Sequence, residues 1–65
     1  MQILLNGERF KTEARSLGEL CEGLGFGSAK VATAVNGSFV AAPARQEVQL
    51  AERDEVEIVA PRQGG

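Results

Sequence analysis

The chain has no histidine, no tryptophan and no tyrosine, and it has one cysteine among its 65 residues. Without histidine, the cysteine and the serines lack the base that usually activates a side-chain nucleophile, and the sequence shows no cluster of metal ligands. One cysteine allows no intramolecular disulfide, and a small domain without such staples is typical of a reducing compartment. The sequence therefore predicts neither an enzyme active site nor a metal site.

Charge and hydropathy exclude further classes of partner. Seven basic and nine acidic residues give a net charge of −2. The basic residues are scattered along the chain, so we expect no surface for nucleic acid or anionic lipid. No apolar run approaches the length of a membrane span or of a signal-peptide core. We therefore expect a cytoplasmic protein whose partners are proteins, with no nucleic-acid or membrane partner.

The length of the chain allows one small domain. Such a chain buries only about 60% of its unfolded surface, which leaves little room for an internal active-site cleft. We expect a single domain over residues 1–60 and a flexible C-terminal tail over residues 61–65. Pro61 cannot donate a ladder hydrogen bond, and the glycines that follow have the most backbone freedom to lose on ordering.

Two asparagines mark hairpins. Asn6 and Asn36 are each followed by glycine, and each pair lies between strand-like runs. Asn-Gly between such runs is the strongest short-range hairpin signal, because a type I′ turn needs positive φ at both central positions. The sequence therefore predicts two hairpins, over residues 1–12 and 31–41.

Between the hairpins, apolar residues recur at helical spacing. One helix face holds, at positions i, i+3, i+4 and i+7, Leu17, Leu20, Cys21 and Leu24. Ser16 is a suitable N-cap, Glu19 completes a capping box, and Gly25 supplies the left-handed position that ends a helix. We expect one short helix over residues 17–24, with Cys21 as a small buried thiol.

The remaining segment is expected to be less regular. After Pro43, Val48 and Leu50 are candidates for a brief strand, followed by a polar turn over 51–54 and a last strand from residue 55. The residues expected to face the core are Ile3, Leu5, Phe10, the helix leucines, Val31, Val35, Val56 and Ile58. This order of elements fits an α+β core in two layers, with one helix packed across one face of a mixed sheet.

That arrangement leaves the other face of the sheet open to water. The alternation that directs core residues inward directs Leu4, Ala34 and Val59 outward. Single exposed apolar residues are common on protein surfaces, whereas a cluster of them on one face makes a docking patch. Leu4, Ala34 and Val59 are therefore the candidates for partner docking.

The chain ends in Gly64-Gly65, shortly after the predicted last strand. Glycine has no Cβ, so such a tail can enter a narrow channel in a partner, where its terminal carbonyl carbon is open to attack from either face. Two glycines at a chain end are also common as frayed backbone without a function. Both interpretations of the pair stay open at this point.

Three segments precede this pair in a fixed order: MQILLNG at 1–7, VNGSFV at 35–40 and DEVEIV at 54–59. Together they resemble the ThiS family, the sulfur carriers of thiamin biosynthesis. The resemblance covers the whole chain and implies a ubiquitin-like β-grasp fold, with a mixed sheet of four or five strands and one helix across one face. Arg53 departs from the pattern, because such carriers usually have glycine there, and the geometry of that turn stays open.

The resemblance implies a carrier and cosubstrate, not an enzyme. An adenylating, E1-like enzyme would bind the sheet face, take Arg62, Gln63 and Gly64 into its channel, and use ATP to join AMP to the Gly65 carboxylate. A sulfur-donor protein would then convert Gly65 to a thiocarboxylate, from which thiazole synthase would take sulfur. The chain itself would bind no cofactor, since ATP would belong to the partner.

Three other functions stay open. The molybdopterin-type sulfur carrier shares the fold and the Gly-Gly end but is usually longer. A β-grasp protein-interaction module would need no chemistry at its end and would survive loss of the two glycines. A ubiquitin-like modifier would instead be joined to lysines of target proteins.

Overall fold

The computed structural model describes residues 1–27 and 30–60. In chain order its elements are the strands β1 (Gln2–Leu5) and β2 (Glu8–Lys11), the helix α1 (Leu17–Gly23), the strands β3 (Ala32–Val35) and β4 (Ser38–Val40), the 3-10 helix η1 (Ala42–Glu47), and the strand β5 (Glu55–Val59). The flexible tail expected over residues 61–65 lies outside the described residues. Within the described ranges, no helix is long and apolar enough to cross a membrane.

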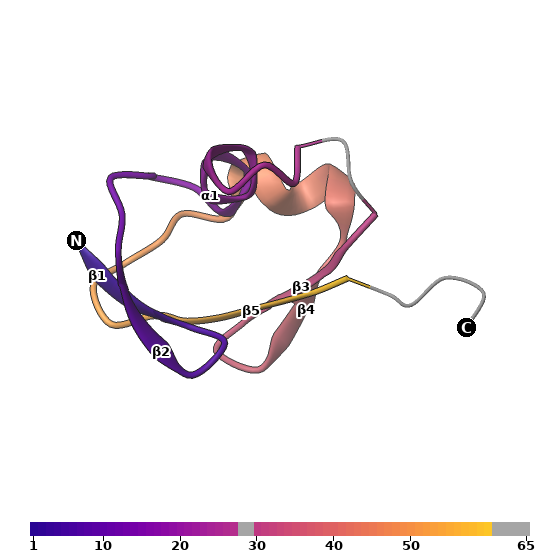
Figure 1. The fold of residues 1–65 in the computed structure, drawn as a ribbon. Coiled ribbons are helices and arrows are strands. Elements are labelled where there is room, and N and C mark those ends of the chain that lie inside the picture. Colours follow the sequence, from indigo (N-terminus) through magenta and orange to yellow (C-terminus); the bar gives the residue numbers. More distant parts are fainter. Residues whose placement is uncertain (28–29, 61–65) are drawn as a thin grey trace.

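The five strands form one mixed sheet in the order β2-β1-β5-β3-β4 (Figure 1). The last strand of the chain, β5, lies in the middle of the sheet, parallel to β1 and antiparallel to β3. Both helices, α1 and η1, lie over the same face of the sheet (Figure 1). The α+β class, the mixed sheet and the helix across one face are confirmed, and the sheet has five strands.

Both predicted hairpins are confirmed. Asn6 has φ 52° and Asn36 has φ 51°, and the glycine after each has φ 84°. Two successive residues with positive φ are what a type I′ turn requires. β1 therefore folds back antiparallel on β2, and β3 folds back on β4 in the same way.

The predicted N-terminus of the helix is confirmed, with one difference in its capping. Ser16 is the N-cap, and its Oγ accepts a hydrogen bond from the Glu19 backbone N at 3.1 Å. The Glu19 carboxylate accepts from the backbone N of Arg15 at 2.8 Å. The second bond of the predicted capping box is therefore shifted by one residue, from Ser16 to Arg15.

The end of α1 shows the glycine stop that the sequence predicts. Gly25 has φ 89°, and its backbone N donates to the Glu22 carbonyl at 3.1 Å. The backbone N of Phe26 donates to the Cys21 carbonyl at 2.8 Å. These two bonds form a Schellman motif around the left-handed glycine. The α-helical residues end at Gly23, one residue earlier than predicted, with Leu24 as the C-cap.

The core lies between the sheet and α1. Its buried apolar residues are Ile3, Leu17, Leu20, Cys21, Val40, Leu50, Val56 and Ile58. Five residues predicted to face the core are partly buried and pack against this cluster, namely Leu5, Phe10, Leu24, Val31 and Val35. The sequence did not point to Val40 and Leu50, although both are buried. The predicted core is therefore confirmed in the sheet and the helix, and extended by one residue each from β4 and from the segment after η1.

The segment after β4 differs from the prediction. It forms the helix η1, with a proline in its first turn, and the strand expected around Val48 and Leu50 is reduced to one bridge between Ser16 and Gln49. Arg45 of η1 donates from Nε to Thr33 Oγ1 at 3.0 Å. These contacts hold η1 against β3, and the short segment after η1 pairs instead with residues around the start of α1.

The turn before β5 has the geometry that glycine favours. Arg53 has φ 72°, in the left-handed region. Its backbone N donates to the Gln2 carbonyl at 2.7 Å, and the Asp54 carboxylate closes the turn by accepting from the Ala51 backbone N at 2.8 Å. An arginine thus adopts a backbone conformation that favours glycine.

Candidate functional site

The alternation along β5 defines two faces of the sheet. Val56 and Ile58 are buried beneath the helices, whereas Glu55, Glu57 and Val59 are exposed on the opposite side. We call this opposite side the outer face. Successive side chains of a strand point to opposite sides. The burial of Val56 and Ile58 in the core therefore leaves Glu55, Glu57 and Val59 on the outer face.

The strand register extends the outer face to both neighbours of β5. Directly paired residues of adjacent strands lie side by side on one face of a sheet. Leu4 of β1 pairs with Glu55, and Ala34 of β3 pairs with Glu57. Both are half-buried, and Val59 is 59% exposed. The structure therefore brings the three predicted docking residues, Leu4, Ala34 and Val59, together on the outer face.

Phe39 is a further apolar residue of this face that the sequence prediction missed. It pairs with Ala34 across β3 and β4, and its side chain is 73% exposed. A signal for it exists in the sequence, since alternation along β4 places Phe39 opposite the buried Val40. We call Leu4, Ala34, Phe39 and Val59 the apolar patch.

Two carboxylates lie in the middle of the outer face. One row of paired residues crosses it through Arg9, Leu4 and Glu55. A second row crosses it through Phe39, Ala34 and Glu57. Because β5 is central, its exposed glutamates separate Leu4 on one side from Ala34 and Phe39 on the other. The face thus combines apolar contacts with a central negative charge.

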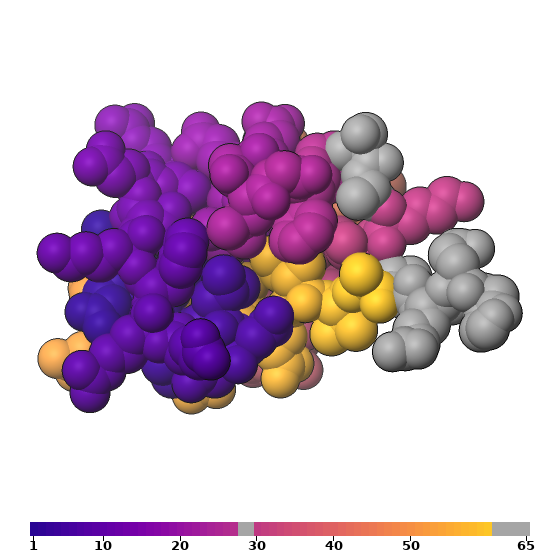
Figure 2. Space-filling view, viewed as in Figure 1, coloured from indigo at the N-terminus to yellow at the C-terminus, as the bar shows by residue number. Residues whose placement is uncertain are grey.

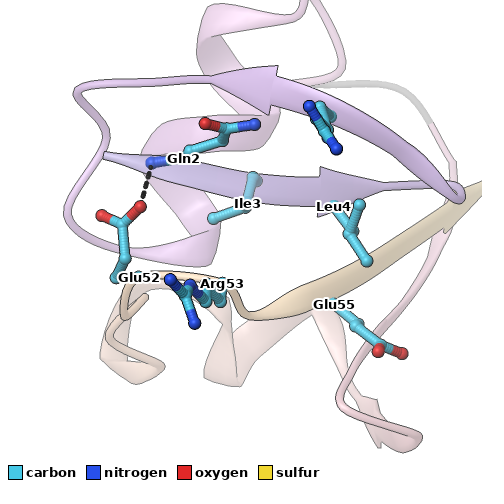
Figure 3. A pocket seen from close by; sticks show the side chains of 7 residues that line it. Gln2, Ile3, Leu4, Glu52, Arg53 and Glu55 are labelled. Carbon is cyan, nitrogen blue, oxygen red and sulfur yellow. Dashed lines mark hydrogen bonds between the residues drawn. The ribbon is translucent and has the colours of Figure 1, made fainter.

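A shallow cavity of about 570 Å³ lies on the same face, at the start of β5 (Figure 3). Its lining residues are Gln2, Ile3, Leu4, Arg9, Glu52, Arg53 and Glu55. The Gln2 backbone N donates to the Glu52 carboxylate at 3.1 Å, which closes one side of it (Figure 3). The cavity lies at the opposite end of β5 from Val59, away from the point where the chain leaves the sheet.

The C-terminal end of β5 is held from both sides. On one side its backbone pairs with β3 as far as Val59, which lies opposite Ala32. On the other side the Asn6 side chain bonds to Ile58, with distances of 3.1 Å from Nδ2 to the Ile58 carbonyl and 2.9 Å from the Ile58 N to Oδ1. Figure 2 shows the end of this strand, in yellow, at the molecular surface beside the indigo N-terminal hairpin.

The predicted tail residues follow directly in the chain. Arg62, Gln63, Gly64 and Gly65 lie outside the described residues, so their predicted roles stay predictions. The outer face and the end of β5 are described, and they lead to Ala60, from which the tail continues.

Cys21 has the environment of a structural thiol. It is buried in the core cluster. Burial raises the pKa of the Cys21 thiol above its ordinary value, and the charge of Arg45 opposes this shift. Cysteine reacts as the thiolate, so these surroundings disfavour its use as a nucleophile. Among residues 1–27 and 30–60, no three His, Cys, Asp or Glu side chains gather closely enough to hold a metal ion.

Two of three comparisons with known proteins found a match. The model of the ThiS family matches residues 3–65. The crystal structure of the thiamine biosynthesis protein ThiS from Geobacter metallireducens is similar, with a TM-score of 0.80, 28% sequence identity and 100% coverage of both chains. A search of curated protein sequences found no significant match.

Proposed function

The chain belongs to the ThiS family, and we propose that it is a sulfur carrier of thiamin biosynthesis. In this proposal the Gly65 carboxylate is adenylated and converted to a thiocarboxylate, which donates sulfur for thiazole formation. The observation that carries the proposal is the family match over residues 3–65, because it includes both the outer face and Gly64-Gly65. The likeness to a thiamine biosynthesis protein over the full length of both chains supports it further.

Activation at Gly65 follows from the chemistry of a carboxylate. A carboxylate is a poor electrophile, because its negative charge is shared by both oxygens. Transfer of AMP from ATP to Gly65, with release of pyrophosphate, removes this charge and creates a leaving group. A donor protein then supplies sulfur at the oxidation level of sulfide, whose attack on the acyl carbon displaces AMP, and the resulting thiocarboxylate serves thiazole synthase as a sulfur source. The catalytic groups for these steps belong to the partners, and the chain acts as their cosubstrate.

The apolar patch is the proposed docking surface for the adenylating enzyme. Exposed apolar residues on one face of a sheet are candidates for an interaction site, and Phe39 and Val59 are the most exposed large apolar side chains of the sheet. The carboxylates of Glu55 and Glu57 lie between the apolar residues, which favours a partner that places basic groups there. A surface of this kind sets the orientation in which the end of β5 meets the partner.

The tail supplies reach from this surface to a recessed ATP site. Five residue steps separate Ala60 from Gly65, which corresponds to roughly 17 Å at full extension. We propose that Arg62, Gln63 and Gly64 occupy the channel of the partner, with glycine at the narrowest point because it has no side chain.

Intact mass spectrometry tests the chemistry. We expect that incubation with a cognate adenylating enzyme, ATP and a sulfur donor raises the mass of the chain by the exchange of one oxygen for sulfur, located at Gly65. Deletion of Gly65 should abolish the adenylate while leaving partner binding largely intact. If a partner of verified activity produces neither adenylate nor thiocarboxylate, the carrier function is wrong and an interaction module takes its place.

A pair of substitutions tests the docking surface. Val59→Asp should weaken binding to the adenylating enzyme at least about tenfold, because it places a charge in an apolar contact. Ala44→Asp is the matched control, since Ala44 is exposed on η1 in the helical layer and should not affect binding. Titration calorimetry measures both. Equal affinities of the two variants would place the docking surface elsewhere.

A further inference from the structure

Asn6 lies where β1 stops and β5 continues. The backbone pairing of these strands covers Leu4 opposite Glu55 and Leu5 opposite Val56. β5 extends three residues further, to Val59, and there β1 no longer accompanies it. The side of β5 that faces away from β3 therefore needs other hydrogen-bond partners beyond Val56.

The Asn6 side chain supplies these partners. Its Nδ2 donates to the Ile58 carbonyl at 3.1 Å, and its Oδ1 accepts from the Ile58 backbone N at 2.9 Å. Its own backbone N donates to the Val56 carbonyl at 2.9 Å. A carboxamide has the same donor and acceptor as a peptide group. Asn6 thus takes the place of the next strand residue and continues the parallel ladder to Ile58.

Asn36 provides an internal comparison. It has the same turn conformation in the other hairpin. Its side chain accepts from the Glu55 backbone N at 2.9 Å and donates to the Asp54 carboxylate at 3.0 Å. Each asparagine therefore makes two side-chain hydrogen bonds, but those of Asn36 join it to Asp54 and to the first residue of β5, whereas both of those of Asn6 join it to Ile58 near the end of the strand.

We propose that Asn6 is a positioning residue for the reaction at Gly65. By fixing Ile58 between β3 and the N-terminal hairpin, it fixes the direction in which the chain leaves the sheet. This inference rests on the proposed function, because it assumes that a docked partner takes up the chain end that follows. A reacting carboxylate must meet ATP in a near-attack geometry, and loss of pairing at Ile58 would lengthen the unpaired chain between the docked sheet and Gly65, which lowers the rate of the chemical step.

The matched variants Asn6→Gly and Asn36→Gly separate positioning from stability. Glycine keeps the positive φ of both turns, and each change removes two side-chain hydrogen bonds. In adenylation by the cognate enzyme, we expect Asn6→Gly to lower kcat about tenfold with little change in KM for the carrier, because the apolar patch is unaltered. We expect Asn36→Gly to leave kcat within about twofold of the unmodified chain.

Amide hydrogen exchange gives a second readout that does not depend on the partner. Exchange at Ile58 should accelerate in Asn6→Gly and stay unchanged in Asn36→Gly, because only Asn6 accepts from that amide. Asn6→Asp should give an intermediate kcat, since it keeps the acceptor and loses the donor. Urea midpoints of all variants identify any that are not folded at the assay temperature.

The outcomes distinguish failure of the proposed function from failure of the positioning role of Asn6. If the unmodified chain is not adenylated, the proposed function fails and the positioning role fails with it. If it is adenylated and both glycine variants lose kcat equally, or if Asn6→Gly alters KM alone, the positioning role is wrong while the proposed function stands. Unchanged exchange at Ile58 in Asn6→Gly would also overturn it.

Discussion

Arg53 has a backbone conformation that is unfavourable for a residue with a Cβ atom. Its φ of 72° lies in the left-handed region, where a Cβ approaches the following carbonyl oxygen at a cost of roughly 1–2 kcal/mol. The conformation persists because the turn is held by other contacts. The Arg53 backbone N bonds to Gln2 at 2.7 Å, and the Asp54 carboxylate bonds to Ala51 at 2.8 Å.

We expect Arg53→Gly to raise the free energy of unfolding by about 0.5 kcal/mol, because relief of left-handed strain slightly exceeds the added chain entropy of glycine. The midpoint of urea unfolding measures the effect. Arg53→Ala is the control, since it removes the guanidinium but keeps the Cβ. An equal gain in both variants would mean that the arginine side chain, and not its backbone conformation, is unfavourable.

Residue conformations were predictable where a residue type signals them. The Asn-Gly pairs predicted positive φ at Asn6 and Asn36, because few other residues adopt it readily. Positive φ at Arg53 has no such signal, and only the family pattern raised the question. The Asn6 bonds to Ile58 were also beyond prediction, because they join residues 52 positions apart.

At the scale of elements, α1 depends on its N-cap because it is short. It has seven residues, and helices this short are marginal without external support. The Ser16 side chain binds the Glu19 backbone N, and a backbone bond of 2.9 Å from Leu17 to the Val48 carbonyl adds a second anchor. The start of the helix is thus tied both locally and to the segment before β5.

We expect Ser16→Ala to lower the free energy of unfolding by about 0.5–2 kcal/mol, because the Glu19 backbone N loses its partner. In a domain of this size that is a large share of the total stability. Urea unfolding measures it, and Ser38→Ala is the control, since Ser38 is exposed in β4. If both variants unfold at the midpoint of the unmodified chain, the Ser16 cap contributes nothing to stability.

Local sequence patterns predicted the hairpins and α1 but not η1. Turn pairs, caps and helical spacing act between near neighbours, so they are visible in the sequence. The position of η1 depends instead on Arg45, which bonds to Thr33 of β3 and to the Val31 carbonyl just before that strand. The strand predicted around Val48 and Leu50 depends in the same way on distant residues, and it is reduced to one bridge between Ser16 and Gln49.

At the scale of the whole molecule, the core that residues 1–27 and 30–60 form includes residues from both ends of this range. All buried apolar residues of the cluster lie between Ile3 and Ile58. The last backbone pair of the sheet that involves β5 is Ala32 opposite Val59. We therefore propose residues 1–60 as an independently folding domain.

A chain that ends at Ala60 should have the same urea midpoint and the same slope as the full chain, because it keeps every core residue that the structure describes. It should also bind the adenylating enzyme through the apolar patch without becoming a substrate. Circular dichroism during urea titration checks the first expectation. A lower midpoint would mean that residues 61–65 contribute to the stability of the domain.

The arrangement of the sheet was only partly predictable. Alternation determines the face on which a residue lies, so it placed Leu4, Ala34 and Val59 on the outer face. It does not determine which strands are neighbours, and the central position of β5 came only from the structure. Phe39 was not among the predicted docking residues, although it pairs with Ala34 and alternation along β4 directs it to the same face.

The central position of β5 also has a mechanical consequence. A pull on Ala60 acts along the strand and across the hydrogen bonds that join it to β1 and β3. These bonds share the load in shear, whereas the bonds of an edge strand would peel open one after another. A partner that draws the chain end into a channel therefore pulls against a strand anchored on both sides, and the domain can bear tension without unravelling from its C-terminal end.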